Sequence, residues 1–433
     1  MSTSIIILAA GKGTRLKSNK PKVFHEVGNL PIIFHVIETA KKLKPREIVV
    51  VISQSMLQYK AQILNYDVKI KICIQDEQKG TGHAVKCCEN LISQKTQNTL
   101  ILYADSPLIS SNSLKRLSKN IFLKKAELCI MAMKTHTRNR YGKIILDKKK
   151  NIIKIVEYLD ASLEEKNIEL CNSGFMSFQT NSLFSNLKFL TNKNAKKEFY
   201  LTDMVQIFNQ HNKKISLEIC DYVETLGIND RQELSRVEQI FQEKKINAHR
   251  VNGVTIMDPR STYFSYDTKI SKDCVIYPNV YFGLGVKISE NVKIKSFSHL
   301  EGVVVKKNCE IGPFARIRPE TLIDEDVRIG NFVEVKKSKI SRGAKLSHLS
   351  YVGDSQIGSQ TNIGAGSITC NYDGKKKNET IIGKNCFIGS NTSLIAPLNI
   401  GDNSVIGAGT VLKENIDKKT IVFRKSKVIK KNK

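Results

Sequence analysis

Aliphatic residues recur every six positions through most of the second half of the chain. Three runs keep this spacing, from Ile270 to Leu300, from Val305 to Val335 and from Ile382 to Leu412. An α-helix turns by about 600° over six residues, so successive members of a run would lie about 240° apart and form no apolar stripe. An uninterrupted strand is also excluded, because glycine, asparagine or aspartate often follows the apolar residue and favours a turn. The period is typical of a hexapeptide-repeat β-helix, in which short strands alternate with turns and the aliphatic side chains stack inside.

Counted from Ile270 to Leu412, the repeats amount to about eight coils of about eighteen residues each. The six-residue spacing fails between Thr369 and Ile382. The segment between these residues is polar and rich in turn formers, so we expect it to leave the coil as a loop, where binding sites are often built. We predict a β-helix domain over residues 251–423, followed by a basic, solvent-exposed tail over residues 424–433.

Strand-like and helix-like segments alternate from residue 1 to residue 228. The strand-like runs include Ile5–Leu8, Ile48–Ile52 and Thr99–Tyr103, with helical patterns between them. Such alternation predicts an α/β domain on a largely parallel sheet, with ligands at the carboxyl ends of its strands. Residues 229–250 carry an amphipathic helical pattern and are expected to form a linker helix.

The chain is strongly basic, with 69 Lys and Arg against 41 Asp and Glu and a formal net charge of +28. Its lysines are scattered, whereas proteins that read nucleic acids rely on clustered arginines and aromatic side chains. We therefore expect no nucleic-acid partner and interpret the excess as a solvated surface, leaving open a role in attracting anionic substrates. No apolar stretch reaches the length of a membrane span, about 18 residues, and no signal peptide is recognisable. The ten scattered cysteines fit reduced thiols, so we predict a cytoplasmic protein without a membrane span.

Three polar motifs follow strand-like runs of the first domain. Leu8–Arg15 forms a glycine-rich turn, followed by Lys22; backbone N–H groups and cations of this kind suit the phosphates of a nucleoside triphosphate. The alternative is an ordinary turn between strand and helix. Gln75 and Gly80–Thr81 could pair with the edge of a pyrimidine base, or form a polar loop. Asp105 suits a Mg²⁺ ion bound to phosphates, or is a turn residue.

Together these motifs resemble a known family. The first domain carries LAAGKGTRL, PKVFH, QDEQKGTGHA, YADSPLI, YGK, VEYLDA and NSG, and the β-helix carries GPFARIRP, GNFVEVKKSK, HLSYVGD, NIGAGSITCNYDG and IGSNTSLIAP. These segments closely resemble the bifunctional N-acetylglucosamine-1-phosphate uridylyltransferase/glucosamine-1-phosphate N-acetyltransferase family. The resemblance covers nearly the whole chain. It implies an α/β nucleotidyltransferase domain with a Rossmann-like mixed sheet, followed by an all-β, left-handed parallel β-helix.

The resemblance also implies two reactions and an assembly. Acetyl-CoA would acetylate glucosamine 1-phosphate in the β-helix domain. UTP would then transfer its uridylyl group to N-acetylglucosamine 1-phosphate in the first domain, releasing pyrophosphate. Family members of this kind are homotrimers with the acetyl site between subunits. The alternative is a pyrophosphorylase with this single activity, whose β-helix serves only assembly or regulation.

In the first domain the resemblance implies that Arg15 and Lys22 stabilise the phosphates and that Asp105 with Asn229 holds Mg²⁺. The implied nucleotide and sugar contacts are Leu8, Ala9, Ala10, Gly11, Lys22, Gln75, Gly80, Thr81, Tyr103, Ala104, Asp105, Gly142, Glu157, Asn172, Tyr200, Thr202 and Asn229.

In the β-helix the resemblance implies that His348 is the general base for acetyl transfer, a task that suits the ordinary pKa of histidine. The implied sugar-phosphate contacts are Arg318, Lys336, Tyr351, Asn362 and Lys377. The implied acetyl-CoA contacts are Ala365, Asn371, Tyr372, Ser390, Ala408 and Lys425, with Arg424 as the alternative to the last.

Overall fold

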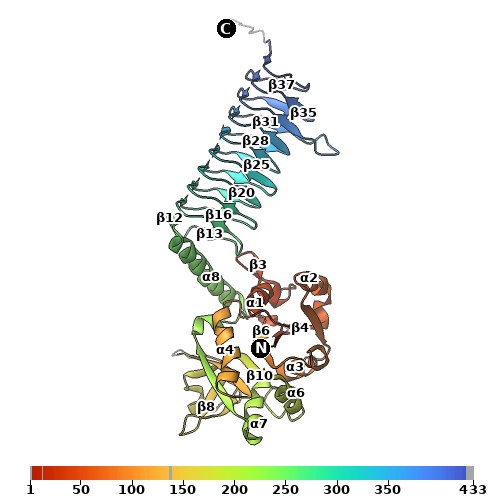
Figure 1. Ribbon diagram of the computed structural model, residues 1–433, viewed down its shortest axis with the longest axis vertical. Helices are drawn as coiled ribbons and strands as arrows, with labels where there is room; N and C mark the ends of the chain where they lie inside the picture. Colours follow the sequence, from red (N-terminus) through yellow and green to blue (C-terminus); the bar gives the residue numbers. More distant parts are fainter. Residues whose placement is uncertain (1, 12, 136–138, 426–433) are drawn as a thin grey trace. The chain divides into compact units, whose positions relative to one another are not determined.

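The structure is a computed structural model that describes residues 2–11, 13–135 and 139–425 (Figure 1). Lys12 in the glycine-rich turn and most of the predicted basic tail lie outside these residues. The chain divides into two compact units, Met1–Glu238 and Gln239–Lys433. The division falls inside helix α8 (Arg231–Val251), which occupies the segment predicted to be a linker helix. Asn229 therefore belongs to the first unit.

The first unit is built on one mixed sheet, which confirms the predicted α/β class. Its strands follow the order β11-β7-β10-β6-β1-β4-β5, and β10 runs antiparallel to both of its neighbours. The bounds are β11 (Ile215–Cys220), β7 (Leu128–Lys134), β10 (Leu170–Gln179), β6 (Asn98–Tyr103), β1 (Thr3–Leu8), β4 (Ile48–Ser53) and β5 (Ile70–Gln75). Strands β8 (Lys143–Leu146) and β9 (Ile152–Val156) extend the sheet beside β10, and β2 (Glu26–Val27) pairs separately with β3 (Leu30–Pro31).

Helices connect these strands and cover the sheet. They are α1 (Ile32–Lys41), α2 (Lys60–Leu64), α3 (Thr81–Lys86), α4 (Ser111–Leu123), α5 (Leu163–Lys166), α6 (Thr180–Leu187) and α7 (Met204–Gln210). Every residue of β4 is buried, as expected for a central strand covered on both faces. Ser110 caps α4 by accepting the backbone N–H of Ser113 at 3.1 Å. None of the helices in the described part of the chain has the length and apolar character needed to cross a bilayer.

Strand direction determines where the predicted motifs meet. β1 runs parallel to both β4 and β6, and β4 runs parallel to β5. Leu8, Gln75 and Tyr103 are the last residues of β1, β5 and β6. Because parallel strands end at the same edge of a sheet, the three motifs that follow these residues lie at one edge.

The second unit is a left-handed parallel β-helix, as predicted. Its strands, as far as Lys425, stack in three sheets of ten, nine and eight strands. The first sheet runs from β12 (Thr255–Ile256) to β38 (Ile421–Val422), the second from β13 (Tyr263–Phe264) to β37 (Val411–Leu412), and the third from β14 (Lys269–Ile270) to β35 (Leu398–Ile400). The aliphatic residues of the six-residue period form a continuous buried core. Turn positions with positive φ are often Asn or Asp, which tolerate this conformation better than most residues.

Two details of the coil differ from, or refine, the expectation. The count from Ile270 omits the first two strands of the first coil, because their core residues Ile256 and Phe264 lie eight positions apart rather than six. Ile340 pairs with Ile357 after 17 residues, whereas Ile357 pairs with Ile382 after 25. The eight additional residues form the loop expected between Thr369 and Ile382, and an isolated bridge joins Tyr372 to Lys377 inside it.

Candidate active sites

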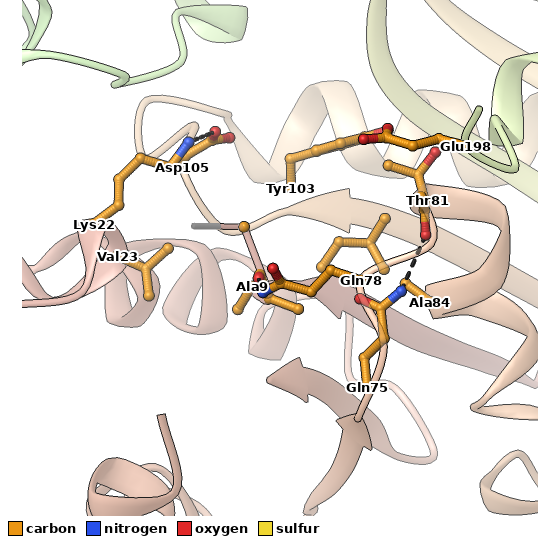
Figure 2. A pocket seen from close by; sticks show the side chains of 14 residues that line it. Ala9, Lys22, Val23, Gln75, Gln78, Thr81, Ala84, Tyr103, Asp105 and Glu198 are labelled. Carbon is orange, nitrogen blue, oxygen red and sulfur yellow. Dashed lines mark hydrogen bonds and ion pairs between the residues drawn. The ribbon is translucent and has the colours of Figure 1, made fainter. Parts of the chain in front are cut away.

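A pocket of about 430 Å³ lies where the strand-end motifs of the first unit meet (Figure 2). Of the residues implied by the resemblance, nine line it besides Lys22: Leu8, Ala9, Ala10, Gly11, Gln75, Gly80, Thr81, Tyr103 and Asp105. Figure 2 shows Lys22 and Asp105 at one end of the pocket and Gln75 with Thr81 at the other. A long ligand with a charged part and a base-like part would fit this polarity.

The charged end of the pocket brings three polar side chains together. The Nζ atom of Lys22 lies 2.5 Å from Oδ2 of Asp105 and 3.3 Å from Oδ1 of Asn229. The side chains of Lys22 and Asp105 are only 12% and 21% exposed. Asn229 is held beside Asp105 because the N–H of Ile228 donates to the backbone oxygen of Asp105 at 2.9 Å. A carboxylate oxygen and an amide oxygen therefore converge on one cationic position.

The opposite end of the pocket is a tight loop between β5 and α3. Nε2 of Gln75 donates to the backbone oxygen of Gly80 at 3.1 Å and lies 3.1 Å from Nδ1 of His83. Gly80 has φ +109°, and a β-carbon there would lie 2.6 Å from the backbone oxygen of Phe199. Only glycine satisfies both constraints, so this loop can close over the end of β5.

Another group of implied contacts gathers beside this pocket without lining it. Thr202 Oγ1 donates to Glu157 Oε1 at 3.1 Å, and the N–H of Asn172 donates to the backbone oxygen of Gly142 at 2.8 Å. Burial raises the pKa of Glu157. Tyr103 lines the pocket and also lies near Glu157 of this group. Burial, and then the charge of the Glu157 carboxylate, raises the pKa of the Tyr103 hydroxyl.

Some of the expected residues are placed differently. Arg15 is exposed on a 3-10 turn (Thr14–Leu16), Ala104 is fully buried, and neither residue lines the pocket. Tyr200 and Glu157 line a separate pocket of about 450 Å³.

Sequence reasoning missed four residues of the main pocket. They are Val23, Gln78, Ala84 and Glu198. Gln78 lies between Gln75 and Gly80 in the loop that the sequence analysis assigned to the base, so its position could have predicted that it lines the pocket. No motif marked Glu198, because it is distant in the sequence from the other residues of the pocket and meets them only in the folded chain.

In the second unit, His348 ends strand β27 (Lys345–His348) and pairs in register with Asn331 at the end of β24 (Arg328–Asn331). Nδ1 of His348 lies 2.8 Å from Oδ1 of Asn331. Because a carbonyl oxygen only accepts, Nδ1 carries the proton and Nε2 keeps a free lone pair. The side chain of His348 is exposed, so that lone pair is accessible to a substrate.

The coil register places several implied acetyl-CoA contacts in one column with His348. Leu346 pairs with Ile363, and the same line of core residues continues through Ile388, Ile406 and Val422. The residues two positions after these five are His348, Ala365, Ser390, Ala408 and Arg424. Lys425 lies one position beyond this column.

Charged side chains gather near the extruded loop. The ammonium of Lys336 lowers the pKa of Lys377, first through a direct contact and then through its charge. Asn371 Nδ2 donates to Asp354 Oδ2 and, at 3.4 Å, to the hydroxyl of Tyr351. Two ammonium groups held next to one another form a position suited to an anion.

The remaining implied contacts lie around this group. Arg318 Nη1 is paired with Glu334 Oε1 at 2.8 Å, and Glu334 lies one coil before Tyr351. Asn362 is half-buried in β30 (Asn362–Ile363), and Tyr372 is exposed on the loop, its hydroxyl donating to the backbone oxygen of Gly374.

Comparison with protein families agrees with both halves of the fold. Residues 4–222 match the nucleotidyl transferase family, residues 379–414 match the hexapeptide repeat of succinyl-transferase, and residues 299–394 match the GMPPB C-terminal domain. The fold and the two sites thus define a nucleotidyltransferase joined to a hexapeptide-repeat acyltransferase.

Similar proteins identify the family. The bifunctional protein GlmU of Zymomonas mobilis is 40% identical over 98% of this chain and 94% of its own length. Those of Buchnera aphidicola and Wolbachia pipientis are 42% and 39% identical, each over 99% of this chain and 98% of the relative. The chain belongs to the GlmU family, which confirms the resemblance drawn from its motifs. It is a bifunctional enzyme of UDP-N-acetylglucosamine synthesis, with uridylyltransferase and acetyltransferase activities, and its nucleotidyl transfer depends on a divalent metal ion.

Proposed function

We propose that the pocket of the first unit transfers the uridylyl group of UTP to N-acetylglucosamine 1-phosphate, using the residues implied by its motifs. The observation that carries this assignment is the convergence of Lys22, Asp105 and Asn229 at the end of a pocket that also holds the glycine-rich turn. A phosphate oxygen of the sugar phosphate attacks the α-phosphorus of UTP, and pyrophosphate leaves. Such transfers depend on positioning and on neutralising charge rather than on a covalent nucleophile.

Each part of the pocket then has a task. The ammonium of Lys22 neutralises charge on the phosphates, and Arg15 reaches them from its exposed turn. Backbone N–H groups of the glycine-rich turn, from Gly11 onward, bind phosphate oxygens, while Gln75 with Gly80–Thr81 reads the uracil edge. Gly142, Glu157, Asn172, Tyr200 and Thr202 bind the sugar of N-acetylglucosamine 1-phosphate.

The donor set of Asp105 and Asn229 fits Mg²⁺. Their oxygens lie 2.5 and 3.3 Å from a single cation, the Lys22 ammonium, so both point to one position that can hold positive charge. In the described residues, no group of three or more His, Cys, Asp or Glu side chains could hold a metal ion. This agrees with Mg²⁺, which usually takes only one or two protein ligands and completes its shell with phosphates and water. When bound, Mg²⁺ would supply charge neutralisation on the triphosphate.

For acetyl transfer we propose that His348 acts as general base. Its Nε2 removes a proton from the amine of glucosamine 1-phosphate as the nitrogen attacks the thioester carbonyl of acetyl-CoA, and the CoA thiolate leaves. Asn331 holds the ring in the tautomer that this step requires. The adjacent ammonium groups of Lys336 and Lys377 bind the phosphate of the sugar, assisted by Arg318, Tyr351 and Asn362.

Acetyl-CoA would lie along the column that continues from His348. The small side chains of Ala365, Ser390 and Ala408 leave room for the pantetheine arm, and Asn371 with Tyr372 borders it from the loop. Arg424 is the last member of the column within the described residues, so we propose Arg424 rather than Lys425 as the cation that meets the CoA phosphates.

A stripe of exposed apolar residues supports assembly as a homotrimer. Phe297, Phe314, Phe332 and Leu349 occupy the same turn in four successive coils, all with positive φ, and are 54%, 45%, 55% and 59% exposed. The rings stack with centroids 4.8 and 5.1 Å apart. Bulky residues rarely accept positive φ, and an exposed apolar stripe marks an interface. Because Leu349 follows His348, a neighbouring subunit on this stripe would border the acetyl site.

One pair of assays tests the assignment. Pyrophosphate release from UTP, Mg²⁺ and N-acetylglucosamine 1-phosphate reports the first reaction, and thiol release from acetyl-CoA with glucosamine 1-phosphate reports the second. Lys22→Ala or Arg15→Ala should cripple only the first, and His348→Ala only the second. Loss of both activities from any one change would contradict the assignment of two sites. We place the enzyme in the cytoplasm and expect no binding of nucleic acid at physiological salt.

A further inference from the structure

Gln78 joins two loops that are distant in the sequence. It lies between β5 and α3 and lines the main pocket (Figure 2). Its Nε2 donates to the backbone oxygen of Ala10, 68 positions away in the turn after β1. The same β5–α3 loop is closed by the hydrogen bond from Gln75 to Gly80. Gln78 therefore connects the loop assigned to the base with the turn assigned to the phosphates.

The hydrogen bond controls the direction of one peptide group. In a trans peptide the carbonyl oxygen and the following N–H point in opposite directions, so holding the oxygen of Ala10 also holds the N–H of Gly11. Before this point the chain is held by the N–H of Ala9, which donates to the backbone oxygen of Val51 at 2.9 Å. After it, the next backbone hydrogen bond within the described turn runs from Leu16 to Gly13 at 3.1 Å.

The peptide between Ala10 and Gly11 could otherwise rotate easily. Gly11 is exposed, and an added β-carbon would meet nothing within 4 Å, so packing does not restrain it. Glycine also accepts both signs of φ, which removes the local barrier that other residues impose. A rotated peptide would present a carbonyl oxygen in place of an N–H, and an oxygen repels phosphate.

We propose that Gln78 is a positioning residue that keeps the Gly11 N–H oriented for the triphosphate of UTP. This inference rests on the proposed uridylyl transfer and adds to it a residue that does not itself react. The amide of Gln78 acts through the backbone of Ala10, so its effect depends on whether the ligand carries phosphates.

The test compares binding of UTP and of uridine to full-length protein. Gln78→Ala removes the donor, and Gln78→Glu keeps the shape of the side chain but cannot donate when ionised. Gln54→Ala is the matched control, because Gln54 donates to Asp76 in the same loop but does not line the pocket. Dissociation constants for UTP come from calorimetry and those for uridine from displacement of UTP. Thiol release by the second site, measured on each preparation, confirms an intact second unit, and retained uridine binding confirms an intact first unit.

Both Gln78 variants should bind UTP about three- to ten-fold more weakly, as expected for one hydrogen bond, while uridine changes less than about two-fold. The Gln54 control should match the parent for both ligands. Unchanged UTP binding in Gln78→Ala, or an equal loss for uridine and UTP, would overturn the inference. Because these are equilibrium measurements, they decide the role of Gln78 separately from turnover; parent protein that releases no pyrophosphate would instead overturn the proposed uridylyl transfer.

Discussion

The ammonium of Lys22 lies 2.5 Å from the carboxylate of Asp105, although 83 positions separate the two residues in the chain. Strand pairing explains the contact, since β1 and β6 are adjacent and parallel, with Leu8 opposite Tyr103. The turns that follow both strands therefore share one edge of the sheet. Asn229 completes the group from just before α8.

Replacing Asp105 by Asn should weaken the binding of Mg²⁺ that the first reaction uses. The change replaces the only carboxylate of the two proposed ligands by a neutral amide and leaves the largely buried Lys22 without its counter-charge. We expect the half-saturating Mg²⁺ concentration for pyrophosphate release to rise by about ten-fold or more. Thiol release by the second site should be unaffected. Asp76→Asn, outside the pocket, is the control, and an unaltered Mg²⁺ curve for Asp105→Asn would remove this residue from the metal site.

His348→Ala should lower the turnover of acetyl transfer by about 10²- to 10⁴-fold, the usual contribution of a general base. Asn331→Ala should have a smaller effect, because the imidazole remains but its tautomer is no longer held. Its loss should appear in turnover more than in the KM for acetyl-CoA. Steady-state thiol release at saturating substrates measures both variants, and equal turnover for Asn331→Ala and the parent would show that the hydrogen bond is not used.

The Lys336–Lys377 pair predicts a pH dependence of sugar-phosphate binding. Lys336 lowers the pKa of Lys377, so Lys377 loses its proton at a lower pH than an ordinary lysine. The KM for glucosamine 1-phosphate should therefore begin to increase at a lower pH than the loss of a proton from an ordinary lysine would produce. In Lys336→Met the pKa of Lys377 rises, so this increase should move to higher pH, on a KM that is larger throughout. A KM curve of the same shape in both proteins would contradict the pairing.

Arg424 and Lys425 can be separated by two single changes. Arg424→Ala should raise the KM for acetyl-CoA by about ten-fold, as expected for a lost hydrogen bond to a charged phosphate, because Arg424 lies in the column of His348. Lys425→Ala should leave it nearly unchanged. Measuring the same KM values with acetyl-dephospho-CoA would show which phosphate of CoA contacts Arg424. The reverse ranking of the two variants would restore Lys425 as the contact.

The phenylalanine stripe predicts an assembly phenotype. Phe314→Glu places a charge in the middle of the exposed stripe and should convert trimers to smaller species in analytical ultracentrifugation. Acetyl transfer should fall with assembly, while pyrophosphate release should persist. Leu284→Glu, at an exposed apolar position outside the stripe, is the control. Intact trimers in Phe314→Glu would show that this stripe is not the subunit interface.

Much of the architecture follows from local spacing. The six-residue period from Ile270 to Leu412 determines a β-helix, because each aliphatic residue must face the interior of a coil whatever the rest of the chain does. The alternation of strands and helices before residue 229 likewise determines an α/β sheet with its motifs at strand ends. The spacing does not reveal the first two strands of the first coil, because Ile256 and Phe264 are eight residues apart and break the period.

Tertiary structure alone decided which distant residues meet. Gln78 reaches the oxygen of Ala10 only because β1 and β5 end at one edge of the sheet, and Asn331 meets His348 only through the register of two coils. The same register places Arg424, rather than its neighbour Lys425, in line with His348. Periodicity and motifs describe residues that are close along the chain. These contacts depend instead on strand order and coil length, which bring together distant segments whose sequences do not indicate that they will meet.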